Sequence, residues 1–296
     1  MEPLRIDSAF VGKPWRGVTR HSTWRDTTNY AAAVGDLNPV YFDDEREDGL
    51  IAPPLFAVTL GWPLIADIHE YIDLPYPKAV FHQLVHYTTF IDFNRLIVPD
   101  TRVHVQGDIA AIAPHRSGTE CVFRFRVSDE QGEPYHTEYM GCVLRDVTCT
   151  DDGKGMDEIP RLPKETFDEP PRWQAEVHMG EAQAHVYDGC TGIVNPIHTS
   201  PRFAHSVGLS DPIIQGTLTI ATGVKEVIDR ELACNPLHVR RISAKLTGMV
   251  LGGDLLDVQL LHRQETTENT TLYFQIYSRR TNQLVLSYGT VFATRR

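Results

Sequence analysis

The chain has 296 residues, of which 42% are hydrophobic, and it carries a formal charge of −11 at pH 7. This hydrophobic content supports a packed core and excludes a largely disordered chain. The acidic balance argues against nucleic acid or an anionic membrane surface as the main partner. The five cysteines are an odd number without C-x-x-C spacing, so we expect neither a disulfide framework nor a metal site.

Targeting signals are not evident in the sequence. The N-terminal residues hold no apolar run of the kind found in signal peptides. No stretch approaches the roughly 18 uninterrupted apolar residues that a membrane span requires. We therefore expect a soluble cytoplasmic protein that binds neither nucleic acid nor membranes.

The first recognisable segment is Tyr30-Ala-Ala-Ala-Val-Gly-Asp-Leu-Asn-Pro-Val-Tyr41. A Pro-containing turn follows it, and then an apolar stretch predicts a helix over Ala57–Tyr71. Four alternating, β-rich runs separated by Gly, Pro and Asp predict consecutive strands joined by short turns, which favours an antiparallel sheet. The predicted strands are Phe81–Phe93, Arg102–Ala113, Glu120–Ser128 and Tyr135–Asp146.

Residues 150–171 are rich in Pro, Gly and Asp, which is typical of an extended linker. This composition predicts a boundary between a first unit, residues 1–149, and a second unit, residues 172–296. Because two packed units would share their sheet edges, we expect the linker to run in an ordered way over the surface.

The second unit repeats the first. Its segment Tyr187-Asp-Gly-Cys-Thr-Gly-Ile-Val-Asn-Pro-Ile-His198 matches the earlier segment at a constant offset of 157 residues, with Gly, Asn and Pro in equivalent places. Apolar residues at helical spacing predict a helix over Thr217–Leu232. The strands predicted after it are Val239–Leu246, Leu255–Gln264, Thr270–Arg279 and Leu284–Ala293.

These elements predict an α+β fold. A long helix followed by an antiparallel sheet is expected to lie against the sheet, which wraps around it. Each isolated unit would leave a sheet edge exposed, so we expect the two units to pair edge to edge.

At this point the chain resembles a known family. Gly192-Ile-Val-Asn195-Pro196-Ile-His198, followed by Gly208-Leu-Ser-Asp-Pro212-Ile-Ile-Gln-Gly216, is similar to the motifs of MaoC-like, type-2 (R-specific) enoyl-CoA hydratases. The first half resembles the N-terminal half of the double-length members through Tyr30–Gly35 and Val85-His86. The resemblance implies a double hotdog fold, in which two helices are each wrapped by an antiparallel sheet and the sheets join.

In that family an Asp and a His activate a water that adds to an enoyl thioester. The resemblance implies that His198 is the catalytic histidine, that Asn195 supports the site and that the Gly216 N–H polarises the thioester carbonyl. Ile193 stands at the position of the Asp, and it can neither orient water nor carry a proton. The resemblance thus implies an atypical Asp/His dyad that is split between the halves, with the His in the second half and the Asp in the first.

In the first half the pattern is reversed, because Asp36 matches the Asp but Tyr41 stands where the His belongs. Asp36 is read either as a catalytic group or as the cap of an Asn-Pro turn. Tyr41 is read either as a proton donor or as a packed aromatic. Asn38 belongs to the same segment and is a candidate substrate contact.

Other residues are candidate substrate contacts. Ile193 is expected to form a pocket wall, while His82 and His86 share a face of one predicted strand and line a pocket of the first half or fill its core. Arg240, Arg241 and Lys245 lie on the first strand of the second sheet, where they would hold phosphates or form a solvated face. Two further stretches, Asn235-Pro-Leu-His238 and the acidic run Asp43–Asp48, are interpreted as a turn leading into a strand and a solvated loop.

The leading hypothesis is a hydratase or dehydratase, a hydro-lyase acting on an enoyl or 3-hydroxyacyl thioester. Coenzyme A or phosphopantetheine would enter as part of the substrate, and no other cofactor is expected. One alternative is a specialised dehydration or cyclisation enzyme that uses Asp36 and Tyr41. Others are a catalytically degenerate, thioester-binding accessory subunit and a hotdog thioesterase with Asp211 near the helix start. A homodimer of double hotdogs is a further possibility.

Overall fold

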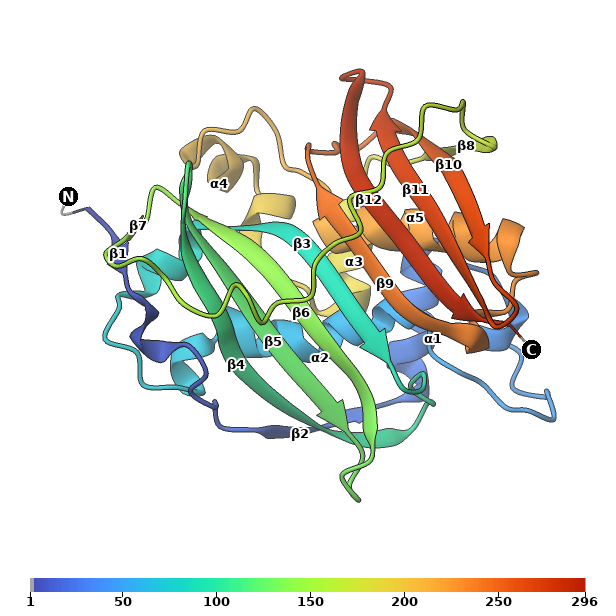
Figure 1. Ribbon diagram of the computed structural model, residues 1–296, viewed down its shortest axis with the longest axis horizontal. Coiled ribbons are helices and arrows are strands. Elements are labelled where there is room, and N and C mark those ends of the chain that lie inside the picture. The colour runs from blue at the N-terminus through green and yellow to red at the C-terminus, as the bar shows by residue number, and fades with distance from the viewer. Residues whose placement is uncertain (1–2, 296) are drawn as a thin grey trace.

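The computed structural model describes residues 3–295, in which ten strands form one continuous antiparallel sheet (Figure 1). The first half contributes the order β2-β4-β5-β6-β3 and the second half contributes β9-β12-β11-β10-β8. The order within each half is therefore mirrored about the central pair β3 and β9. Those two strands run antiparallel, with Ile91 opposite Ile242, and this confirms that the halves join edge to edge.

The strand boundaries agree closely with the sequence-based expectations. In the first half the strands are β2 Val18–Ser22, β3 Leu84–Phe93, β4 Thr101–His115, β5 Gly118–Ser128 and β6 Pro134–Arg145. In the second half they are β8 Trp173–His178, β9 Val239–Leu246, β10 Leu255–Glu265, β11 Asn269–Ser278 and β12 Gln283–Thr294. The short edge strands β2 and β8 were not expected, and a separate pair joins β1 Arg5–Ile6 to β7 Thr148–Cys149.

The helices lie on one side of the sheet (Figure 1). They are α1 Trp24–Val34, α2 Val58–Ala66, α3 Gln183–Thr191, α4 Pro201–Ser206 and α5 Gly216–Glu231. Helix α5 agrees with its prediction to within one residue at each end. Helix α2 ends five residues before the predicted Tyr71; it contains Pro63, which has no amide hydrogen to donate, and the chain passes into a short 3-10 turn.

Both copies of the repeated segment form the same local structure. Gly35 and Gly192 end α1 and α3 in the left-handed conformation, with φ of 72° and 68°, which only glycine adopts without steric cost. Three residues later, the side-chain oxygen of Asn38 or Asn195 accepts from the backbone N–H two residues on, at 3.2 and 3.1 Å. The segments are therefore turns that begin with a glycine cap and fix the position of their last residue, Tyr41 or His198.

The Asn235-Pro-Leu-His238 stretch makes the same Asn-Pro turn without a glycine cap before it. Asn235 accepts from Leu237 N–H at 3.0 Å, and the turn leads into β9 as expected. Residues 150–171 form no strand beyond an isolated bridge between Lys154 and Ile112, and they cross the outer face of the sheet (Figure 1). Phe167 in this linker stacks on His262, with ring centroids 4.7 Å apart. The linker is therefore held against the second half.

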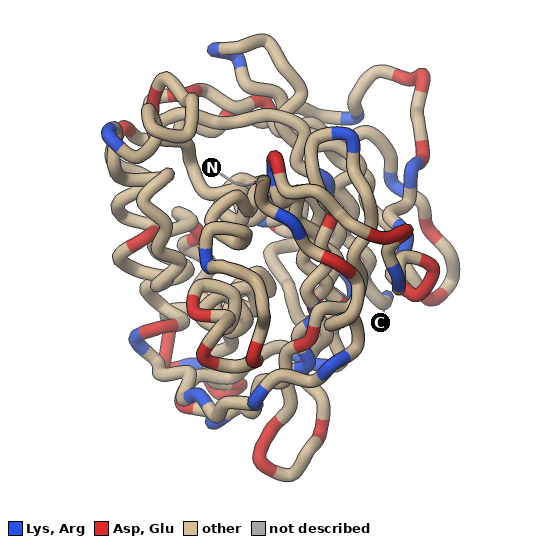
Figure 2. Tube along the Cα trace, turned by 90° about the vertical axis from the view of Figure 1, so that its left-hand side faces the viewer, with Lys and Arg blue, Asp and Glu red and all other residues tan. Residues whose placement is uncertain are grey.

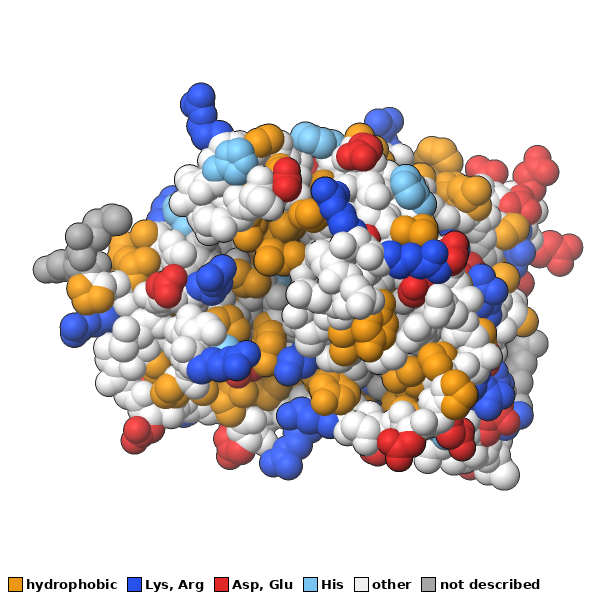
Figure 3. Space-filling model, turned by 90° about the horizontal axis from the view of Figure 1, so that it is seen from above, with side chains coloured by type: hydrophobic (Ala, Val, Ile, Leu, Met, Phe, Trp, Pro, Cys, Tyr) orange, Lys and Arg blue, Asp and Glu red, His pale blue; other side chains and the backbone are white. Residues whose placement is uncertain are grey.

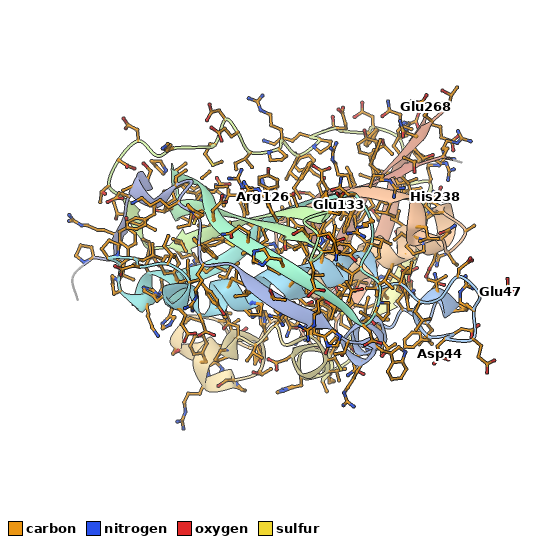
Figure 4. All side chains as sticks on the ribbon, turned by 90° about the horizontal axis from the view of Figure 1, so that it is seen from below. Asp44, Glu47, Arg126, Glu133, His238 and Glu268 are labelled. Carbon is orange, nitrogen blue, oxygen red and sulfur yellow. The ribbon has the colours of Figure 1, made fainter. Side chains whose placement is uncertain are left out.

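The charged residues are distributed over the loops. Figure 2 shows Lys, Arg, Asp and Glu interspersed on one side of the molecule. The residues of the run Asp43–Asp48 are mostly exposed, and Asp44 and Glu47 project outward (Figure 4). Among residues 3–295, no helix has the length and apolar character needed to cross a membrane.

Candidate active site

A pocket of about 110 Å³ lies where the two halves meet. Val85 and Met249 are partly exposed at its rim, whereas Met140, Val58 and Thr217 are buried at its floor. The first half lines the pocket with Val58, Trp62, Leu84, Val85, His86 and Met140. The lining residues of the second half include Ile193, Asn195, His198, Gln215, Gly216, Thr217 and Leu246. Figure 3 shows the molecule from above, which is the side where α4 and the C-terminal end of β9 lie. On this side hydrophobic side chains are exposed between Lys and Arg side chains.

His198 lies in the pocket at the end of the second repeated segment. Its Nδ1 is 2.8 Å from the Ile213 carbonyl oxygen, and because a carbonyl only accepts, Nδ1 carries the hydrogen and donates it. The neutral ring therefore keeps Nε2 as an acceptor. Loss of hydration on burial lowers the pKa of His198 to about 4, partly offset by this hydrogen bond, so the ring is neutral at physiological pH.

Helix α5 begins at the pocket, with Gly216 as its first residue and Gln215 as its N-cap. The first N–H groups of a helix have no partner within it, and the helix dipole favours negative charge there. A Cβ atom added to Gly216 would lie 2.4 Å from Leu246 Cδ1 and 3.4 Å from His86 Nδ1. The glycine thus allows the backbone to approach both side chains closely.

His86 comes from β3 of the first half and lines the same pocket. The sequence suggested a place in a first-half pocket, beside His82; instead His86 joins the site of the second half, and His82 lies in the 3-10 turn Lys78–Gln83 before the strand. His86 Nε2 is 2.8 Å from Thr89 Oγ1. Burial lowers the pKa of His86 to about 4, so two neutral imidazoles, one from each half, line one pocket.

Gln215 was not singled out by the sequence analysis, although it directly precedes Gly216. Its side chain is buried and lines the pocket, and its Nε2 donates to the Ala184 carbonyl at 3.0 Å. Its Oε1 is buried with no hydrogen-bond partner in the described part of the chain. Because buried acceptors are normally satisfied, this oxygen suits a polar ligand or a water.

Ile193 occupies the position that the family resemblance assigns to an Asp. It is 3% exposed and forms part of the pocket wall, as the sequence suggested. None of the described residues that line the pocket is an Asp or a Glu. Among the described lining residues, the side chains that can carry a proton near neutral pH are therefore those of His86 and His198.

Asp36 and Tyr41 do not line this pocket. The Asp36 carboxylate accepts from Asn38 N–H at 3.2 Å, as in the turn-capping interpretation, and burial together with Asp229 raises its pKa to about 6. The Tyr41 side chain is 1% exposed, and its hydroxyl has no partner among residues 3–295. Burial raises the pKa of Tyr41 well above 10, which makes it a poor proton donor.

The structure separates Asp36 from His198. Asp36 lies near Asp229, close to the end of α5, whereas His198 lies by its first residue, Gly216. Thirteen residues of helix separate those two points, or roughly 20 Å along the axis. Asp36 and His198, the two members of the split pair, therefore lie at separate places near opposite ends of α5.

The remaining candidates lie outside the pocket. Asn38 uses its Nδ2 to donate to the Cys234 carbonyl at 2.6 Å. Arg240 donates to the carbonyls of Leu237 and Val239, and Arg241 pairs with Asp92 at 2.6 Å. Lys245 lies over the Tyr87 ring, 5.0 Å from its centroid. The phosphates of a substrate would lie outside an acyl pocket. That Arg240, Arg241 and Lys245 contact them stays a prediction.

A second cavity of about 330 Å³ adjoins the first and shares Trp62, Leu84 and Asn195 with it. Lys78 and His82 also line it. Lys78 was not predicted from the sequence, because it begins the 3-10 turn before β3 and no motif marks it.

Comparisons with known proteins agree with this architecture. Residues 163–282 match the family model described as the MaoC-like domain, and residues 9–137 match the FAS1-like dehydratase domain region. The chain is 23% identical over 272 residues to a probable enoyl-CoA hydratase 2 from Dictyostelium discoideum, covering 90% of this chain and 89% of that protein.

Solved structures show the same fold. A MaoC-like dehydratase from Phytophthora capsici has a TM-score of 0.82 at 19% identity and covers 97% of this chain and 98% of its own. A conserved hypothetical protein from Mycobacterium tuberculosis with a double hotdog fold has a TM-score of 0.59 at 13% identity, covering 94% and 96%. The second half is thus similar to the MaoC-like domain, the first half is similar to the FAS1-like dehydratase region, and the chain has the double hotdog fold.

Proposed function

We propose that the chain is a hydro-lyase that reversibly adds water to a 2-enoyl thioester in the pocket between the halves, with His198 as the acid and base. The family supports a hydratase or dehydratase function. The observation that carries the proposal is that one pocket holds both the Nε2 of a neutral His198, which has no partner among residues 3–295, and the first N–H groups of α5, which have no partner within the helix.

In the hydration direction, His198 Nε2 accepts a proton from a water whose oxygen forms the bond to C3. The electrons of the C2–C3 double bond move toward the thioester carbonyl, and its oxygen gains negative charge. The Gly216 N–H, at the positive end of α5, donates to that oxygen. His198 then returns the proton to C2, so that the enzyme ends in its starting state.

Two further groups complete this arrangement. The unpartnered Oε1 of Gln215 accepts the second hydrogen of the water and orients it, in place of the carboxylate that Ile193 lacks. His86 holds its Nδ1 beside Gly216. Its ring is held by the Thr89 hydroxyl and by the Thr88 backbone, so the imidazole forms a fixed wall beside the carbonyl oxygen.

The substrate's carrier would occupy the adjoining cavity. A pantetheine arm, from coenzyme A or a carrier protein, would leave the first pocket past Trp62 and Asn195, which line both cavities. Lys78 would then lie along its path and offer a cation to a phosphate.

The test is hydration of crotonyl-CoA by wild type, His198→Ala and His205→Ala. His205 is a matched control because its ring also contacts a backbone carbonyl, that of Ser210 at 2.9 Å, but it is exposed and outside the pocket. We expect His198→Ala to lower kcat by about 10²- to 10⁴-fold, the usual range for a general acid or base. Wild-type rates in His198→Ala would refute the assignment.

One observation favours a second candidate function, a thioester-binding accessory subunit. The pocket has Ile193 in its wall and no carboxylate among the described lining residues, so it could bind an acyl thioester without turning it over. Calorimetric binding of a saturated acyl-CoA, together with no turnover across a panel of enoyl-CoAs, would establish this function instead.

A further inference from the structure

Two polar side chains, those of His136 and Glu138, lie on the inner face of β6, where an apolar core is expected. His136, Glu138 and Met140 alternate along this strand, so they point toward the helices. His136 and Glu138 are each 2% exposed. Neither His136 Nε2 nor Glu138 Oε2 has a hydrogen-bond partner within residues 3–295.

Glu138 lies one strand step beyond the pocket floor. Met140 lines the pocket, and Glu138 is the next residue on the same face, or roughly 7 Å further along the strand. Glu138 lies opposite Ile91 of β3 and Phe125 of β5. On this face of the strand Met140 is the residue between the pocket and Glu138, and a methionine side chain is unbranched and adapts to its surroundings.

A series of neighbouring hydroxyl groups also extends from the pocket floor toward Glu138. Thr217 lines the pocket, and its Oγ1 accepts from the Tyr187 hydroxyl at 3.2 Å. The Tyr187 hydroxyl is 3.4 Å from that of Tyr30, its counterpart in the first half. The charge of Glu138 contributes to the raised pKa of both tyrosines, so the acid and the hydroxyls lie near one another.

An unpartnered acid in this position is costly for the fold. A buried polar group without a partner destabilises the folded state, whereas an apolar residue of the same size does not. Burial raises the pKa of Glu138 to about 8, so at neutral pH the carboxyl is mostly protonated and can both donate and accept. A group of this kind is suited to an oxygen on a ligand.

From this placement we infer that the acyl pocket extends past Met140, and that Glu138 binds an oxygen substituent, a hydroxyl or keto group, on the distal part of the acyl chain. The inference rests on the proposed function, because it names the class of acyl thioester that the site prefers. The substrate class is thus an oxygenated acyl thioester rather than a plain fatty acyl thioester.

The test compares trans-2-hexenoyl-, octenoyl- and decenoyl-CoA with their ω-hydroxy counterparts. We expect wild type to favour at least one hydroxylated member by about tenfold in kcat/KM over its plain partner. Glu138→Met should remove this preference, and Glu138→Gln, which still offers a hydrogen-bonding amide, should keep part of it. Glu120→Met, on the outer face of β5, is the matched control and should keep it fully.

Crotonyl-CoA separates the two hypotheses, because its acyl chain is too short to reach Glu138. Equal crotonyl-CoA turnover by wild type and Glu138→Met, with no preference for any hydroxylated member, would overturn this inference and leave the proposed function intact. If no enoyl-CoA is turned over, the proposed function fails. The preference is then measured as the ratio of Kd values for saturated acyl-CoAs with and without the ω-hydroxyl, and an equal ratio in wild type and Glu138→Met also overturns the inference.

Discussion

Replacing Glu138 with Met should make the protein more stable, and by an amount that depends on pH. Met has a similar size and no polar group to desolvate, so the substitution conserves volume in the core. The fully buried Glu138 has a folded-state pKa of about 8, raised by burial from 4.5. The gain in unfolding free energy should therefore follow the ionisation of this one carboxyl.

The direction in which the wild-type unfolding free energy changes with pH follows from proton binding. Between pH 4.5 and 8 the folded state keeps a proton on Glu138 that the unfolded state has lost, so wild-type stability falls as the pH rises through this interval. The slope approaches about 1.4 kcal/mol per pH unit. The ionisation contributes roughly 1 kcal/mol to the difference between variants at pH 5 and roughly 3 kcal/mol at pH 7.

Urea unfolding of wild type and Glu138→Met at both pH values measures this difference. Other groups that titrate in the interval, such as Asp36 with its pKa of about 6, are common to both variants and cancel. An unfolding free-energy difference that is the same at pH 5 and pH 7 would refute the reasoning, because the acid would then ionise equally in both states.

Three further predictions concern the pocket and its surroundings. Because burial lowers the pKa of His198 to about 4, kcat/KM for crotonyl-CoA should stay level from pH 8 to about pH 5 and fall only near pH 4; an acid limb near pH 6.5 would contradict this. Gly216→Ala should raise KM several-fold, since its Cβ would displace Leu246 and narrow the space beside His86, and an unchanged KM in steady-state kinetics would argue against a thioester at this helix end. Tyr41→Phe removes a buried hydroxyl without a partner in the described residues, so it should leave hydration rates unchanged and raise the unfolding free energy by about 1 kcal/mol; lost activity would instead support a first-half site.

Short-range patterns in the sequence predicted much of the fold. The repeated Gly, Asn and Pro produce the same capped turn in both halves, because glycine caps and Asn side chains act on backbone groups within a few residues. Helix α5 follows from its periodicity, and all eight predicted strands follow from alternation, β-rich composition and the turn residues between them. The edge strands β2 and β8 and helix α3 were missed because they are short or only weakly periodic. Helix α1 was also missed, although the capping box of Thr23 and Asp26 and the Gly35 cap mark its two ends in the sequence.

The sequence by itself determined the helix and strands of each half, the His198 turn and its helix start at Gly216, because each depends on contacts between neighbours in the chain, and the family resemblance supplied the double hotdog. Only the tertiary structure decided which residues share a site. The pairing of β3 with β9 joins strands some 150 residues apart, and it brings His86 to His198 while the other helix end receives Asp36. The same pairing and the helix layer bury Glu138 behind the pocket. Such neighbours follow from how sheets and helices pack in space, and no short-range pattern in the sequence encodes them.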